Sequence, residues 1–280
     1  MKKYPGTRRL LYTCCLMASL LCNFQSKAAI SKKPVWFQIQ EEEMYDLSDE
    51  QGSSGAFRQQ LVNAVLLEYL RWNHPVAGRE NDSMMCAVMK AYWANLGQTV
   101  STAQLQDSLW EEMHPWSAAF IAWVMRRGGA GEHFYYAPNH AAYIVASREN
   151  VKNQQAVFKA YDIKDSVAAW PKPGDLLCKN RDGKTYSINS IGKKCISHCD
   201  VVVETDTLQR TVTTIGGNVN NRVAKRTVFL NEHGMVDERI LWCITDDPLK
   251  EATGAQADYF AIIKTGEIKA PVSPLLTAGK

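Results

Sequence analysis

The chain has 280 residues, of which 46% are hydrophobic and 22% charged, and its formal net charge is +3. Residues 1–28 hold five cations and no acid, so the net charge of the remaining residues is +3 − 5 = −2. These residues also lack a basic stripe, so a nucleic-acid partner is not expected. A chain of this length can bury one sizeable core, and no later segment is apolar enough to suggest a membrane span.

The first residues have the layout of a secretory signal peptide. Four cations within residues 1–9 precede an uncharged stretch at 10–22, and Ser26-Lys27-Ala28 offers a cleavage signal of small residues. The stretch is shorter than the roughly 20 residues that span a bilayer, so a permanent anchor is not favoured. We therefore expect an exported, periplasmic protein cleaved near Ala28. A lipoprotein anchored at Cys22 is a minor alternative, because leucines and not a small residue precede that cysteine.

Residues 29–55 are polar and predict a linker, 56–265 a single domain, and 266–280 a flexible tail. Apolar residues at helical spacing, with glycine and proline at the ends, predict helices at 57–72, 83–96, 102–109, 117–127 and 139–148. Short β-branched runs predict strands at 175–177, 201–204, 210–215, 224–230 and 240–245. Helices followed by strands are typical of the α+β class.

Five cysteines remain after the predicted cleavage, namely Cys86, Cys178, Cys195, Cys199 and Cys243. In an oxidising compartment an odd number leaves at least one thiol unpaired. We expect a disulfide from Cys178 to either Cys195 or Cys199. A zinc site is not expected, because no second cysteine or histidine pair accompanies Cys195 and Cys199.

Four separated segments resemble one superfamily. They are Pro115-Trp116-Ser117-Ala118-Ala119-Phe120, Pro173-Gly174-Asp175-Leu176, Ser197-His198-Cys199-Asp200-Val201 and Ile215-Gly216-Gly217-Asn218. In this order they resemble the NlpC/P60 and CHAP cell-wall amidases, and within that superfamily the DUF2272 family, over roughly residues 57–246. The resemblance implies a papain-like fold, with N-terminal helices packed on an antiparallel sheet, and no cofactor or metal.

The resemblance also implies a catalytic set of Ser117, His198 and Asn218. Serine stands where the superfamily usually has a nucleophilic cysteine. In the first turn of a helix, the Ser117 hydroxyl would lie beside unpaired backbone N–H groups that can stabilise an oxyanion. His198 on a strand would take the Ser117 proton, and Asn218 on the neighbouring strand would orient the imidazole.

Four further residues are predicted to surround the substrate, which by the resemblance is peptidoglycan or a wall-derived peptide. Trp116 and Gly217 lie in the matching segments, and His140 follows Pro138-Asn139 at a position expected beside the groove. Asp200 is two residues after His198, so it shares one face of the strand and is either a second orienting group or a plain ion-pair partner.

Two functions stay open at this point. A serine cannot be ionised in advance as a cysteine can, so the domain is either a serine acyl hydrolase or a non-catalytic relative that binds a wall peptide or another partner. An enzyme requires Ser117 within about 3 to 4 Å of a His198 ring nitrogen in a cleft, whereas a buried Ser117 favours the binding function.

Overall fold

The computed structural model describes residues 56–73, 82, 85–181, 183, 185–237, 242–247, 250–256 and 258–268, with the backbone alone for 242–247 and 250–256. All of these residues belong to the unit that spans 50–280. The predicted signal peptide at 1–28, the linker at 29–55 and most of the tail at 266–280 lie outside the described residues, so they stay predictions. No helix in the described part is long and apolar enough to cross a bilayer.

The first half of the domain is helical, as predicted. The helices are α2 (Ala56–Trp72), α3 (Cys86–Ala94), α4 (Thr102–Leu105), α5 (Ser108–Met113), α6 (Ser117–Arg127) and α7 (His140–Glu149). The helix predicted at 102–109 is divided into α4 and α5 because the segment contains two N-cap residues only six positions apart. Ser101 caps α4 through the Gln104 N–H, and Asp107 caps α5 through the Leu109 N–H.

One antiparallel sheet forms the second half. Its strands lie in the order β1-β8-β2-β3-β4-β5-β6-β7. Their bounds are β1 (Phe158–Asp162), β2 (Leu176–Asn180), β3 (Ser197–Asp206), β4 (Thr211–Val219), β5 (Arg222–Phe229), β6 (Trp242–Asp247), β7 (Lys250–Gln256) and β8 (Tyr259–Thr265). The first six strands in this order, from β1 through β8 to β5, carry the buried residues that the structure describes in the sheet. Strands β1, β7 and β8 were not predicted, and β8 pairs with both β1 and β2.

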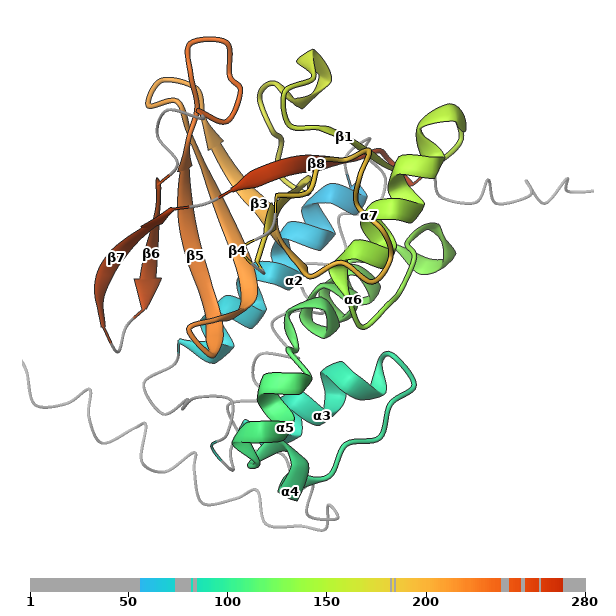
Figure 1. Ribbon diagram of the computed structural model, residues 1–280, viewed down its shortest axis with the longest axis vertical. Helices are drawn as coiled ribbons and strands as arrows, with labels where there is room; N and C mark the ends of the chain where they lie inside the picture. Colours follow the sequence, from blue (N-terminus) through green and yellow to red (C-terminus); the bar gives the residue numbers. More distant parts are fainter. Residues whose placement is uncertain are drawn as a thin grey trace, which may run out of the picture. The chain divides into compact units, whose positions relative to one another are not determined.

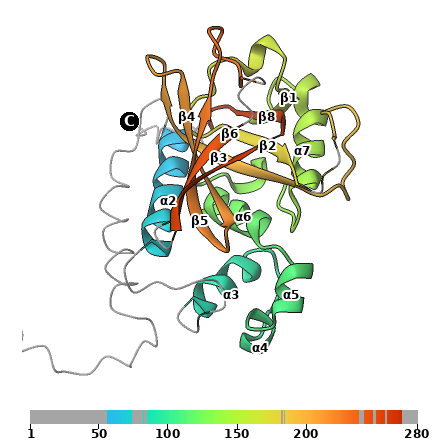
Figure 2. The same cartoon turned by 60° about the vertical axis from the view of Figure 1, so that its left-hand side comes forward.

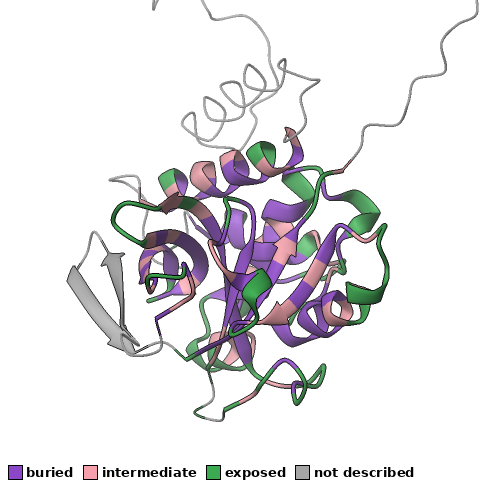
Figure 3. Cartoon of the chain, turned by 90° about the horizontal axis from the view of Figure 1, so that it is seen from above, coloured by how far each residue is buried: buried purple, intermediate pink, exposed green. Residues whose placement is uncertain are grey.

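Both faces of the sheet are covered. Helices α2, α6 and α7 pack on one face, and α3, α4 and α5 lie beyond α6, away from the strands (Figures 1 and 2). On the other face a cluster that includes Leu177, Val202 and Ile262 packs against Trp170 and Met235 from two loops. The central strands consist mostly of buried residues, as their purple colour in Figure 3 shows. The predicted α+β class with helices on an antiparallel sheet is confirmed.

A buried polar cluster holds α2, α3 and α6 together, and it comprises Glu68, Arg71, Tyr92 and Trp123. Glu68 accepts hydrogen bonds of 2.9 Å from Arg71 and from the Trp123 indole, and a third from the Tyr92 hydroxyl. Gly128 follows the last residue of α6 and lies close to α2. Glycine is needed at this position because a Cβ would lie 2.7 Å from the Leu61 Cα. These contacts fix the helix that begins at Ser117.

Candidate functional site

Ser117 is the first residue of α6, and its hydroxyl faces another helix start. Its Oγ lies 2.7 Å from Nε2 of His140, the first residue of α7. Asn139 caps α7 by accepting from the Ala142 N–H at 2.9 Å, which fixes the direction from which His140 enters the site. Both side chains are buried, Ser117 at 2% and His140 at 4% exposed. The serine and the histidine thus form a directly hydrogen-bonded pair.

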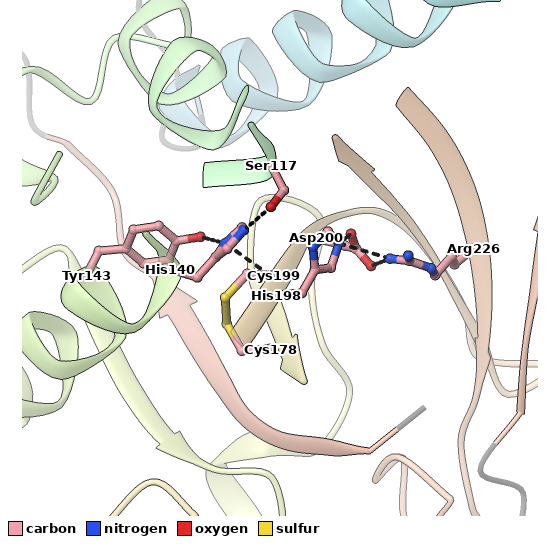
Figure 4. Close-up of a disulfide and its surroundings, with 8 residues drawn as sticks. All are labelled: Ser117, His140, Tyr143, Cys178, His198, Cys199, Asp200 and Arg226. Atoms are coloured by element: carbon pink, nitrogen blue, oxygen red, sulfur yellow. Dashed lines mark hydrogen bonds and ion pairs between the residues drawn. A yellow bond between two sulfur atoms is a disulfide. The ribbon is translucent and has the colours of Figure 1, made fainter. Parts of the chain in front are cut away.

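The other side of the His140 ring determines which nitrogen carries the proton. Its Nδ1 accepts from the Cys199 backbone N–H at 3.2 Å and contacts the Tyr143 hydroxyl, and Figure 4 shows Ser117 and Tyr143 on opposite sides of the ring. A backbone N–H can only donate, so Nδ1 must present a lone pair, and the single proton of the neutral ring sits on Nε2. His140 therefore donates to the Ser117 oxygen and, in this tautomer, accepts no proton from it.

The charge of His140 agrees with this assignment. Burial, with further contributions from His198 and Arg181, holds the pKa of His140 well below its usual value, so the ring is neutral at pH 7. The Cys199 N–H is available to His140 because strand pairing between β3 and β4 begins only at Val201. The start of β3 therefore supplies one of the groups that orient the ring.

A second histidine enters from β3. His198 is 2% exposed, and its Nε2 lies 2.7 Å from Oδ1 of Asp200, two residues along the same strand face. Arg226 on β5 contacts the other Asp200 oxygen and lies 3.1 Å from His198 Nε2 (Figure 4). Burial alone would raise the pKa of Asp200, but Arg226 and His198 hold it well below its usual range. The carboxylate is therefore ionised and can only accept, and because it lies closer to Nε2 than Arg226 does, we place the His198 proton on Nε2, which donates to Asp200, so that the Arg226 contact with Nε2 is not a hydrogen bond.

His198 keeps an unused lone pair. Burial lowers its pKa to about 4, although the neighbouring Asp200 acts in the opposite direction, so the ring is neutral at pH 7. With its proton on Nε2, the buried Nδ1 presents a lone pair that has no hydrogen-bond partner among the described residues. The rings of His140 and His198 lie 5.1 Å apart between centroids. The Ser117 hydroxyl and the His198 ring thus lie in one buried region, on either side of a shared neighbour, His140.

Two glycines of β4 make room for different neighbours, Gly216 for the Asp200 side chain and Gly217 for α6. A Cβ on Gly216 would lie 1.7 Å from Oδ1 of Asp200, and a Cβ on Gly217 would lie 2.5 Å from the Cβ of Phe120. Both positions therefore require glycine. Gly217, predicted to contact substrate, allows β4 to pack closely against α6.

The structure differs from the predicted set in three ways. His140, and not His198, makes the hydrogen bond to Ser117. Asp200, and not Asn218, holds His198, because Asn218 lies at φ 55° in a bulge of β4 and makes no hydrogen bond to His198 within the described residues. Trp116 is 1% exposed and stacks on Trp72 with centroids 4.8 Å apart, so its ring supports α6 and is not open to a ligand.

Arg181 is a site residue that the sequence analysis missed. Its Nη1 donates to the Ser117 Oγ over 3.4 Å, although the residue itself is exposed. It lies one residue after β2 in a polar loop, and no local pattern distinguishes it from other surface cations. Only the packing of that loop against the start of α6 reveals the contact.

A disulfide borders the site. Cys178 on β2 and Cys199 on β3 are direct partners in the sheet register, with their Cα atoms 4.1 Å apart, and they are bonded. Of the two alternatives left open for Cys178, this is the pairing with Cys199. Cys86 and Cys195 are free, and Cys243 lies among residues whose side chains are not described. No group of three potential metal ligands occurs in the described part of the chain.

A cavity of about 620 Å³ lies away from this site, near residues 154–157 and the end of β8, and none of the residues around Ser117 lines it.

Comparison with known proteins gave one match. The profile of a family described as "Uncharacterized protein conserved in bacteria (DUF2272)" matches residues 80–265. No curated protein and no solved structure matched the chain.

Proposed function

The chain belongs to the DUF2272 family, and on that premise we propose that its domain is a serine acyl hydrolase of the cell envelope with a papain-like arrangement. One observation carries the proposal: a serine at the start of a helix accepts a hydrogen bond from a neutral histidine, and the ring of that histidine lies 5.1 Å between centroids from a second neutral histidine with an unused lone pair. Such a constellation can generate a nucleophile, receive its proton and stabilise negative charge.

The roles follow from the proton positions. Ser117 Oγ attacks the carbonyl carbon of an amide or ester, and its proton passes to Nδ1 of His198, directly or through one water. Asp200 stabilises the imidazolium that forms, and His198 then returns the proton to the leaving amine or alcohol. Water hydrolyses the acyl-serine by the reverse sequence. His140 donates from Nε2 to Oγ throughout, which favours the developing alkoxide.

The oxyanion would be held by backbone. Trp116, the N-cap of α6, provides no side-chain hydrogen bond to the helix start, so N–H groups of the first turn remain available to an oxyanion. The positive end of the helix dipole acts in the same direction.

The substrate class rests on the sequence. The signal-peptide pattern and the resemblance to cell-wall amidases support an exported, periplasmic enzyme that cleaves amide bonds in peptidoglycan stem peptides. Purified muropeptides should be incubated with the mature protein, Ser117→Ala and Ser117→Cys, and the products analysed by mass. Cleavage by the wild type and the cysteine variant, with none by alanine, supports the proposal, and no product from any variant removes peptidoglycan as substrate.

The geometry expected of an enzyme is not met at two points, and both favour a second candidate function: Ser117 is buried, and it bonds to His140 and makes no hydrogen bond to His198 within the described residues. At 2% exposure the Ser117 hydroxyl does not meet solvent as a bound substrate would require, which suits a non-catalytic relative that binds wall peptides. A fluorophosphonate probe separates the two without knowledge of the substrate. Labelling of the wild type that is absent in Ser117→Ala supports the hydrolase, and equal lack of labelling supports the binding module.

A further inference from the structure

We infer that Arg181 makes this site selective for acyl groups that carry a carboxylate close to the scissile carbonyl. This inference rests on the proposed hydrolase function, which it deepens by naming a substrate class. Arg181 is exposed, yet its guanidinium reaches the Ser117 oxygen at 3.4 Å. It is therefore both accessible to an incoming molecule and within one side-chain contact of the nucleophile.

Contacts of the preceding residue hold the backbone at Arg181. Asn180, the last residue of β2, accepts from the Tyr186 N–H at 3.2 Å and donates to Asp258 at 2.7 Å. These contacts tie the end of β2 to Tyr186 and to Asp258, which directly precedes β8. The backbone is thus fixed next to the sheet, while the long side chain extends toward α6.

The local charge favours an anion. Arg181 acts on His140 and Lys179 on His198, and in each case the cation contributes to lowering the histidine pKa. Asp200, a carboxylate among the described residues of the site, is engaged by Arg226. A negatively charged group near Arg181 would relieve this positive potential, whereas a cationic group would increase it.

Recognition of a substrate carboxylate suits Arg181 better than stabilisation of the oxyanion. Oxyanion donors act by being held rigidly in place before reaction, and the start of α6 already offers backbone N–H groups of that kind. An exposed arginine is less rigid, but its planar fork matches a carboxylate with two parallel hydrogen bonds. Loss of a carboxylate contact raises KM, whereas loss of an oxyanion donor lowers kcat.

The test compares two chromogenic esters of similar size. The wild type, Arg181→Gln and Arg181→Lys hydrolyse 4-nitrophenyl hemisuccinate, which carries a carboxylate, and 4-nitrophenyl butyrate, which does not. We expect the wild type to prefer the hemisuccinate, and Arg181→Gln to lose about 10- to 100-fold in kcat/KM on that ester alone, mainly through KM. Arg181→Lys should retain part of the preference. Arg210→Gln, an exposed arginine in the β3–β4 turn, is the matched control and should change neither ester.

Failure of the inference and failure of the hydrolase proposal give different results. Ser117-dependent hydrolysis with the same ester preference in Arg181→Gln overturns the inference alone. Equal rates for the wild type and Ser117→Ala overturn the hydrolase proposal. In that case the binding of succinate tests whether Arg181 recognises a carboxylate. Succinate should shift the ring nitrogen NMR signals of His140 in Ser117→Ala but not in Ser117→Ala/Arg181→Gln. An equal response in both proteins overturns the inference.

Discussion

Two buried polar clusters in this domain use their polar atoms differently. In the Glu68 cluster both carboxylate oxygens accept hydrogen bonds, from Arg71, Trp123 and Tyr92. Around Ser117, by contrast, the buried Nδ1 of His198 has no partner among the described residues. Burial and the nearby Glu68 raise the pKa of Tyr92 well above its usual value, so the Tyr92 hydroxyl keeps its proton near neutral pH. This contrast supports a structural role for the first cluster and the chemistry proposed for the second.

The largest effect that would test this comparison is on the base. His198→Gln removes the lone pair of Nδ1 while keeping a side chain that can donate to Asp200. Hydrolysis of an active ester should fall by about 10²- to 10⁴-fold, as expected for loss of a general base. The rate is measured by stopped-flow or steady-state absorbance, with thermal unfolding of the same samples. Unchanged hydrolysis would exclude His198 as the base.

The next effect is on stability and falls on the other cluster. Glu68→Ala leaves Arg71 buried without its carboxylate and should lower the free energy of unfolding by about 3 to 5 kcal/mol. Denaturant unfolding measures the loss, and Glu149→Ala at the exposed end of α7 is the control with little expected effect. A stable Glu68→Ala protein with specifically lost hydrolysis would contradict the structural assignment.

The pH dependence of stability probes the neutral histidines. The pKa of His198 is about 4 when folded and near 6.5 in an unfolded chain, so the unfolded chain binds more protons between these values. Stability should therefore fall by roughly 3 kcal/mol as pH drops from about 7 to 4, and His140 acts in the same direction. Urea unfolding at both pH values measures the change. A double variant, His140→Gln/His198→Gln, should show a flatter dependence, and equal slopes would contradict the pKa assignment.

The smallest effect distinguishes the two histidines. A glutamine amide can replace the Nε2–H of His140 as a donor to Ser117, but it cannot replace a base. His140→Gln should therefore reduce hydrolysis by only about tenfold, the value of one neutral hydrogen bond. The ratio of its rate to that of His198→Gln is the measurement. A loss as large as that of His198→Gln would make His140 the base and reverse the roles proposed here.

Local patterns were sufficient for the helical half of the fold. Helix α6 begins and ends where the sequence predicts, because Pro115 precedes its first turn and Gly128 follows its last. Strands β1 and β8 were missed because their pairing joins residues about 100 positions apart, such as Phe158 and Thr265. Such pairing depends on which strands meet in the sheet, and a short apolar run carries no record of its partner.

The sequence by itself determined the α+β class, the bounds of the helix that begins at Ser117, and the two histidines as site candidates. Only the tertiary structure decided which histidine bonds to Ser117, selected Asp200 over Asn218 as the partner of His198, and added Arg181 as a neighbour of Ser117. The physical reason is that a hydrogen bond depends on distances of about 3 Å. Those distances arise where α6, α7 and β3 pack together, and residue spacing along the chain does not specify them.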